Sequence, residues 1–244
     1  MAMARLNIAR AYQAVQQALE EAIMSGALKP GEPLPTETEL AAQFGVTRHT
    51  VREGMRALEQ SGLVKRDAGR RLHVTRPRHD ALASQSSRAL QMQQVSFREI
   101  SEVATQLELL AIDLLEHRID DDLIARLDAN VDAMAAAVAK GESIVDLDVE
   151  FHALLAQATD NRVLLMSREP VSLLFYPSLE KLFVHPRTRS RSPQRLLEAH
   201  RAILEGLRAR DMDRARLWMR RHMADFRRGY DHAGLAIDAP IGGD

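Results

Sequence analysis

The sequence predicts a mainly α-helical protein, in which an N-terminal winged helix-turn-helix precedes an all-helical bundle. Three observations predict this fold class. Within the first 75 residues, two helical stretches separated by a glycine precede two short strand-like runs. After residue 96 no convincing strand follows, and apolar residues recur at helical spacing. The breaks between these later stretches are short, which favours helices that pack against their sequence neighbours.

The first 75 residues contain three predicted helices and a hairpin. Apolar residues from Tyr12 to Ile23 follow helical spacing, and the stretch SGALKPGEPLP ends this helix. A T-x-x-E capping box beginning at Thr36 opens a short second helix, which Gly45 breaks. Thr47 can cap a third helix that runs to about residue 61. The runs LVKR and RLHVT, on either side of DAGR, then favour a β-hairpin.

The rest of the chain divides into a linker, a bundle and a tail. Residues 76–95 are polar and weakly periodic, so we expect a linker, which could be partly helical. Residues 232–244 are expected to be a disordered tail. The region between them, 96–231, holds six segments of helical period, near 97–117, 120–139, 143–159, 162–182, 194–209 and 211–230.

Composition narrows the class of protein. The 244 residues include no cysteine, which excludes disulfides, cysteine-based zinc fingers and a catalytic thiol. There is no apolar run long enough to span a membrane and no apolar core of a signal peptide, so a cytoplasmic protein is expected. Through residue 78 the chain has 12 basic and 8 acidic residues, against 21 and 26 in the remainder. This excess suggests a polyanionic partner for the first part only, although chance clustering would give the same counts.

The third predicted helix has the two faces of a DNA-recognition helix. One face is an apolar stripe, and the other carries basic side chains: His49, Arg52 and Arg56, with Arg48 at the helix start. An arginine that bonds guanine through two hydrogen bonds discriminates by about 1–3 kcal/mol. Further basic residues flank the hairpin tip, where a wing would meet DNA: Lys65, Arg66, Arg70 and Arg71. A solvated basic face is the alternative, but the glycine-broken helix pair and the basic hairpin together favour DNA binding.

The stretch from Tyr12 to Thr75, with its core LPTETELAAQFGVTRHTVREGMRALEQSGLV, resembles the DNA-binding domain of the GntR family of bacterial transcriptional regulators. The resemblance implies that Gly69, at the tip of the wing, approaches the minor groove. It also implies that four residues lie in the major groove: Arg48, His49, Thr50 and Arg52. Thr38 stands where an arginine that contacts DNA is common, and Arg71 where a second glycine is common. Both departures concern the operator sequence rather than the ability to bind DNA.

In the C-terminal part, four polar residues fall on faces that should point into the core. On a helical wheel, Asp148 lies inside the apolar arc of its segment and His152 at its edge, while His200 and His222 lie in the middle of two later stripes. For any one histidine, a core imidazole bonded to a carbonyl group remains an alternative. A buried carboxylate is costly without a partner, however. One aspartate with three histidines suits a divalent ion such as zinc, nickel or manganese.

The segments LDVEFHALLAQATDN and EAHRAILEGLRARDMDRARLWMRRHM resemble the FCD ligand-binding domain of the FadR-like subfamily, over about Phe97 to Tyr230. The resemblance implies a bundle of six or seven helices and, as in many members, a metal bound by one Asp and three His. These positions are matched by Asp148, His152, His200 and His222. Effectors in that subfamily are usually small organic acids whose carboxylate completes the coordination of the metal. Ala104 stands where an effector-holding arginine is common, so another residue replaces it or the effector differs.

The leading hypothesis is a DNA-binding transcriptional regulator, expected to be a repressor, that a small metabolite controls at the metal site. A homodimer would present two recognition helices to a pseudo-palindromic operator. One alternative is a regulator whose metal is purely structural. Another is a metallohydrolase tethered to DNA, but it would need a general base, and Asp146 falls off the face that carries Asp148. The effector, metal, operator and mode of regulation stay open at this point.

Overall fold

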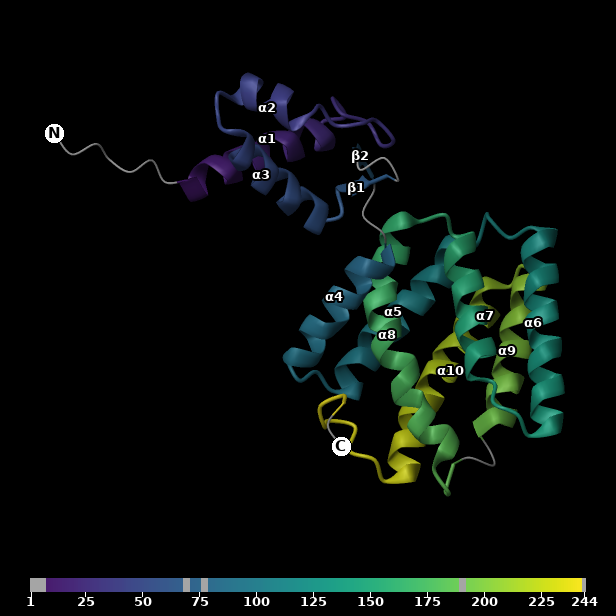
Figure 1. Cartoon of the computed structure of the whole chain (residues 1–244). Coiled ribbons are helices and arrows are strands. Elements are labelled where there is room, and N and C mark those ends of the chain that lie inside the picture. Colours follow the sequence, from purple (N-terminus) through teal and green to yellow (C-terminus); the bar gives the residue numbers. More distant parts are fainter. Residues whose placement is uncertain (1–7, 68–70, 76–78, 189–191, 243–244) are drawn as a thin grey trace. The chain divides into compact units, whose positions relative to one another are not determined.

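The computed structural model describes residues 8–67, 71–75, 79–188 and 192–242 (Figure 1). The chain forms two compact units, Met1–Ala81 and Leu82–Asp244. The first combines helices with a two-stranded sheet, and the described part of the second is helical. The predicted fold class, mainly α with a winged helix-turn-helix before a helical bundle, is confirmed. None of the described helices is both long and apolar enough to cross a membrane.

The first unit contains the expected helices and hairpin: α1 (Ile8–Met24), α2 (Glu37–Phe44), α3 (Arg48–Gln60), β1 (Val64–Arg66) and β2 (Leu72–Val74). The strands are antiparallel, with Val64 opposite Val74. Thr36 and Thr47 cap α2 and α3 through their side chains, as predicted. Between these helices, Gly45 has a φ of 65°, a left-handed conformation that glycine adopts without strain. The turn of the helix-turn-helix therefore follows from local sequence.

The position of α3 is fixed by its apolar face. Val51 and Leu58 are fully buried and share a core with Val15 of α1. At Gly54, a Cβ atom would lie 3.0 Å from the carbonyl oxygen of Tyr12, so α1 and α3 approach closely there and leave little room for a side chain. Burial of this face leaves the basic face of α3 directed outward.

Seven helices are described from residue 79 onward: α4 (His79–Met92), α5 (Phe97–Leu114), α6 (Asp121–Lys140), α7 (Val145–Ala158), α8 (Arg162–Val184), α9 (Ser192–Arg208) and α10 (Met212–Ala233). Helix α10 packs against α9 and α5, α8 packs against α5, and α6 packs against α7 and α9 (Figure 1). Phe97 of α5 stacks on Tyr230 of α10, with ring centroids 3.9 Å apart. The six segments of helical period thus form one bundle with a shared core.

Residues 76–95, expected to be a linker, contain helix α4 between 79 and 92. Ala83 and Ser87 are buried on this helix, and Leu90 packs against the core of the bundle. Because two of these three residues are small or polar, the buried face carries little hydrophobic periodicity in the sequence. The expected linker is therefore largely a helix that contacts the bundle.

Residues 234–242 differ from the expected disordered tail because they pack back on the bundle. Gly234 turns the chain at the end of α10 with a φ of 73°. The backbone N–H of Ile241 donates to the carbonyl oxygen of Val95 at 2.8 Å, and the N–H of Arg98 donates to that of Ile237 at 3.0 Å. The guanidinium of Arg98 also pairs with both carboxylate oxygens of Asp238. The apolar residues of this segment lie too close together in sequence to show a period.

Candidate metal centre and DNA-recognition face

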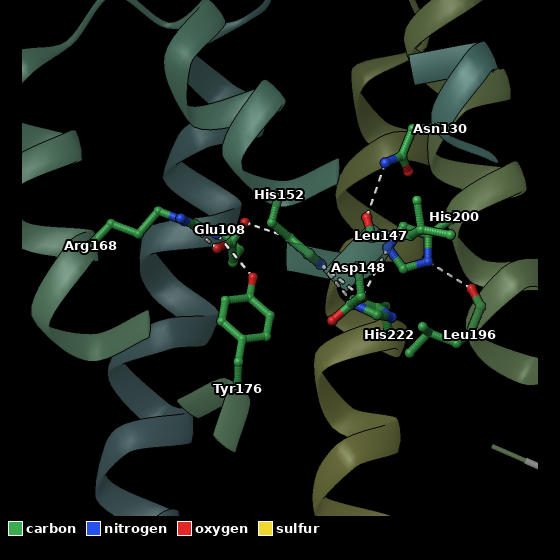
Figure 2. Close-up of polar contacts among 10 residues, drawn as sticks. All are labelled: Glu108, Asn130, Leu147, Asp148, His152, Arg168, Tyr176, Leu196, His200 and His222. Atoms are coloured by element: carbon green, nitrogen blue, oxygen red, sulfur yellow. Dashed lines mark hydrogen bonds and ion pairs between the residues drawn. The ribbon is translucent and has the colours of Figure 1, made fainter. Parts of the chain in front are cut away.

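Four side chains from three helices converge in the core of the bundle (Figure 2). Asp148 and His152 lie one turn apart on α7, His200 lies on α9, and His222 lies on α10. One ligand atom from each lies within 4.8 Å of the ligand atoms of the other three. All four residues are buried, each with at most 1% of its surface exposed. The four residues that the helical wheels predicted to face inward are therefore brought together.

The donor atoms of this cluster face one another at short range. Oδ1 of Asp148 lies 3.2 Å from Nε2 of His200, 3.7 Å from that of His152 and 3.8 Å from that of His222. The Nε2 atoms of His152 and His222 are 2.9 Å apart. Three imidazole nitrogens and a carboxylate oxygen thus point at one small volume.

Two buried atoms of the cluster have no hydrogen-bond partner. Among the described residues, only Asp148 Oδ1, His200 Nε2 and Asn130 Oδ1 are buried side-chain polar atoms without one. The first two face each other at 3.2 Å without hydrogen-bond geometry. An unpartnered buried polar atom costs about 1–3 kcal/mol, which coordination of an ion would offset. The donor set and its two orphaned atoms therefore fit a divalent metal.

Two of the imidazole rings are oriented by hydrogen bonds on the side away from the cluster. Nδ1 of His200 donates to the carbonyl oxygen of Leu196 at 2.8 Å. Nδ1 of His152 lies 2.7 Å from Oε2 of Glu108. A proton on Nδ1 leaves the lone pair of Nε2 available to a metal. The hydrogen bond at Nδ1 thus holds each ring so that its Nε2 points into the cluster.

A buried arginine and a tyrosine support Glu108 in turn (Figure 2). Nε of Arg168 donates to Oε1 of Glu108 at 2.8 Å, and Nη2 of Arg168 donates to the hydroxyl of Tyr176 at 2.9 Å. Burial would raise the pKa of Glu108, but the charges of His152 and Arg168 outweigh burial and lower this pKa to about 2. Glu108 is therefore an anion that can accept hydrogen bonds from both sides.

The pKa values of two of the buried histidines shift in opposite directions. At His222, burial is the largest influence, and together with the charges of His200 and His152 it lowers the pKa well below its usual range. At His152, burial also lowers the pKa, but the charge and hydrogen bond of Glu108 outweigh it and raise the pKa overall. His222 thus remains neutral, which is the form that binds a metal.

Sequence reasoning missed the group formed by Glu108, Arg168 and Tyr176. A signal existed for Glu108, because it lies four residues from both Ala104 and Ile112 on the buried face of α5. No comparable signal marked Arg168, since apolar residues occur on most sides of α8. Its role depends on α5 and α8 lying side by side, which the sequence pattern alone does not give.

Replacing Glu108 with glutamine is expected to weaken zinc binding by roughly 10- to 100-fold, the range typical of outer partners of metal ligands. Glutamine keeps the size of the side chain but removes the charge that holds the Nδ1 proton of His152. Competition with a chromogenic chelator would measure the change. Glu102→Gln, an exposed position on the same helix, is the control. Equal zinc affinities for the two variants would contradict the orienting role of Glu108.

In the first unit, the basic face of α3 is exposed. The side chains of Arg48, Arg52 and Arg56 are 63%, 44% and 60% exposed. His49 on α3 and Thr38 on α2 are exposed as well. These five candidate DNA contacts are therefore accessible to a duplex.

Of the three other candidate DNA contacts, one is buried and two lie outside the described residues. Thr50 is buried, with 7% of its surface exposed, and its hydroxyl lies 2.9 Å from that of Thr47. In the free chain it helps to cap α3 instead of pointing outward. Gly69 and Arg70 lie outside the described residues.

Sequence reasoning also missed Glu37, which contacts the recognition helix. Both carboxylate oxygens of Glu37 accept hydrogen bonds from Arg52, at 3.0 and 2.7 Å. Arg48 lies 3.9 Å from the same carboxylate. The hydrogen bond from Arg52 is the largest influence on the pKa of Glu37 and lowers it. A bidentate pair of this kind holds the guanidinium plane of Arg52 in one orientation.

Two family descriptions match the chain. Residues 11–74 match "Bacterial regulatory proteins, gntR family", and residues 99–225 match "FCD domain". The first covers the helix-turn-helix and its hairpin, and the second covers the bundle with all four residues of the cluster.

Curated relatives match over most of their length. The chain is 28% identical over 212 residues to the HTH-type transcriptional repressor NanR of Cronobacter sakazakii, covering 86% of this chain and 81% of that one. It is also 28% identical over 204 residues to the HTH-type transcriptional regulator LutR of Bacillus subtilis, covering 83% and 93%. Among solved structures, Streptococcus agalactiae GntR superposes with a TM-score of 0.60 at 24% identity, covering 89% and 99%. That similarity supports the fold alone.

Proposed function

The chain belongs to the GntR family of bacterial transcriptional regulators, in the FadR-like subfamily with a C-terminal FCD domain, and on this premise we propose that it represses transcription under the control of a small carboxylate effector. The effector would act at the metal centre of the bundle. The observation that carries this proposal is the buried cluster of Asp148, His152, His200 and His222, with two atoms that lack a hydrogen-bond partner. A bundle that needed only a stable core would not retain them.

The four residues of the cluster would hold a divalent ion through three nitrogens and one oxygen. Imidazole nitrogens suit zinc and nickel, and a carboxylate oxygen also suits manganese, so these three ions are the candidates. Such an ion would offer a Lewis-acid position to an anionic oxygen of an effector. Glu108 would keep the ring of His152 in place, and the carbonyl oxygen of Leu196 would do the same for His200.

We propose that the exposed face of α3 carries the DNA-binding function of the family. We propose that Arg48, His49 and Arg52 reach base edges in the major groove and that Arg56 and Thr38 lie at phosphates. Thr50 would take part only if its bond to Thr47 rearranged, and Gly69 and Arg70 remain proposals from sequence. Glu37 would orient Arg52 before DNA is bound.

A homodimer on a pseudo-palindromic operator is supported by an exposed apolar strip on the bundle. Phe97 lies against Phe175, and Glu108 bonds Arg168, so α5 and α8 run antiparallel. Along the two helix axes, position 103 of α5 therefore lies near position 173 of α8, and position 110 of α5 lies near position 166 of α8. Four side chains at these positions are 41–50% exposed: Val103, Leu110, Met166 and Leu173. A second copy that covered this strip would bring two recognition helices into one complex.

Control of operator binding requires that the effector prefer one arrangement of the protein. An effector with equal affinity for the DNA-binding and DNA-free arrangements would change nothing. We propose that it favours the arrangement that does not bind the operator. A second candidate function keeps the same metal ligands but makes the ion purely structural, so that operator binding is constitutive. Hydrolysis at the metal is not proposed, because the family consists of transcriptional regulators.

Removing the metal is expected to lower the midpoint of thermal unfolding by roughly 5–10 °C. Zinc at 100 times its dissociation constant stabilises the folded state by about 2.7 kcal/mol, and about 1 kcal/mol shifts the midpoint by 2–4 °C for a protein of this size. The measurement is a melting curve with zinc, with a chelator, and with zinc plus small organic acids. A further rise with an acid, seen only with zinc, supports the proposed effector site. If the chelator lowers the midpoint of thermal unfolding but no acid raises the midpoint of the zinc-loaded protein, the structural metal is favoured.

A further inference from the structure

A cavity of about 270 Å³ opens beside the metal centre, between the end of α8, the start of α9 and the second half of α10. His222 lines its inner end, and Leu196, whose carbonyl oxygen orients His200, lines its wall. The cavity therefore leads from the surface of the bundle to one of the four metal-binding side chains.

The metal centre is closed on another side by protein groups. There Glu108 bonds both His152 and Arg168, and Arg168 bonds Tyr176 (Figure 2). These residues are at most 7% exposed, so they leave little room for a ligand. Ala104, also buried, offers no polar group from the same helix as Glu108. A ligand would thus approach from the cavity beside His222.

The inner walls of the cavity are apolar. Leu182 and Phe183 contribute from α8, Leu196 from α9, and Phe226 from α10. The hydroxyl of Thr188, which also lines the cavity, already donates to the carbonyl oxygen of Leu182 at 2.6 Å. A ligand hydroxyl buried against Leu182, Leu196 and Phe226 would lose its hydration without gaining a partner from them, at a cost of about 1–3 kcal/mol. The walls therefore favour a hydrocarbon body over a polyhydroxylated one.

The charged side chains at the rim of the cavity have a net positive charge. Arg195 and Arg228 both bond the carboxylate of Asp225, so two positive charges share one negative charge. Arg187 also lines the cavity and, within the described part of the chain, forms no ion pair. Asp231 is the remaining acidic residue of the lining. Three guanidinium groups against two carboxylates favour the entry of an anion.

We propose that the effector is a monocarboxylate with an apolar body, whose carboxylate points toward the metal centre and whose body lies between Leu182, Leu196 and Phe226. The inference rests on the proposed function, because it assumes that a carboxylate acts at this centre. It adds the chemical class of the body and the route of entry. Sugar acids and tricarboxylates, whose polar groups would meet these walls, are expected to bind more weakly.

The test compares three probes on the zinc-loaded full chain: hexanoate, gluconate and hexan-1-ol. Hexanoate and gluconate share a six-carbon chain and one carboxylate, and differ in the hydroxyl groups of the body. Hexan-1-ol keeps the body of hexanoate and lacks the charge. Isothermal titration measures binding, and the thermal midpoint reports it independently. We expect hexanoate to bind at least about tenfold more tightly than either of the other probes.

Phe183→Gln places an amide in the wall and is expected to weaken hexanoate binding by about tenfold, with zinc affinity unchanged. The control is Val184→Gln, the next residue of α8, which is 74% exposed and does not line the cavity. Circular dichroism and zinc affinity show whether each variant folds. If Phe183→Gln does not fold, Arg187→Gln at the rim replaces it, with weaker binding of hexanoate expected.

The possible results separate this inference from the proposed function. Tight binding of hexanoate that Phe183→Gln weakens and Val184→Gln does not supports the inference. Binding of gluconate as tight as that of hexanoate, or hexanoate binding that is equal in both variants, overturns the inference but leaves a carboxylate effector in place. If neither acid binds zinc-loaded protein that still binds zinc and DNA, the inference is overturned and the proposed effector site loses its support as well.

Discussion

His200→Ala is expected to lower the affinity of the chain for zinc by more than about 100-fold, beyond the range seen for outer partners of metal ligands. The side chain is fully buried, and its Nε2 lies 3.2 Å from Asp148 Oδ1. Alanine removes one of the four donors and leaves the carboxylate with fewer partners. Competition with a chromogenic chelator would measure the loss of zinc affinity.

The same variant is expected to keep the operator affinity of the metal-free wild type. The reason is that His200 belongs to the second unit, whereas the basic face of α3 belongs to the first. His117→Ala, which removes an exposed imidazole of the second unit, is the control. Loss of operator binding by His200→Ala with an intact zinc site would contradict this division of roles.

Arg52→Ala is expected to have the opposite effect. Operator affinity should fall by roughly 10- to 100-fold, since a bidentate arginine–guanine contact contributes about 1–3 kcal/mol. Zinc affinity should not change. A duplex selected from a random pool with the full wild-type chain serves as the operator, and its affinity is measured by fluorescence anisotropy at fixed salt.

Arg201→Ala is the matched control for Arg52→Ala. It removes the same charge from an exposed position on α9 of the second unit. Equal losses of operator affinity in both variants would mean that Arg52 acts only through net charge. That result would contradict its assignment to base edges.

The four candidate metal ligands could be predicted because each helix carries its own period. Asp148 and His152 lie one turn apart, and His200 and His222 interrupt apolar stripes, so each faces inward whatever its neighbours are. Their convergence needed the tertiary structure, although the resemblance to the FCD domain pointed to the same set. Capping by Thr36 and Thr47 was predictable for the same local reason.

The residues that sequence reasoning missed depend on contacts between helices. Glu108 and Arg168 lie 60 residues apart and meet only because α5 and α8 pack together. Arg52 and Glu37 likewise meet across the turn between α2 and α3. The packed segment 234–242 is held by backbone hydrogen bonds to Val95 and Arg98 and by the ion pair of Arg98 with Asp238, and no periodic pattern in the sequence marks these contacts. Hydrophobic periodicity identifies the buried face of a single helix or strand, whereas each of these contacts connects two separate elements.

The claim that links the two units is that a carboxylate at the metal centre controls operator binding. The most direct measurement is the operator affinity of the wild-type chain and of His200→Ala, each titrated with hexanoate, gluconate and citrate in the presence of zinc. We predict that at least one acid weakens operator binding of the wild type by about tenfold or more. The same acid should have no effect on His200→Ala or on the chelated wild type. Operator binding that no acid changes, or that changes equally in His200→Ala, would contradict the account.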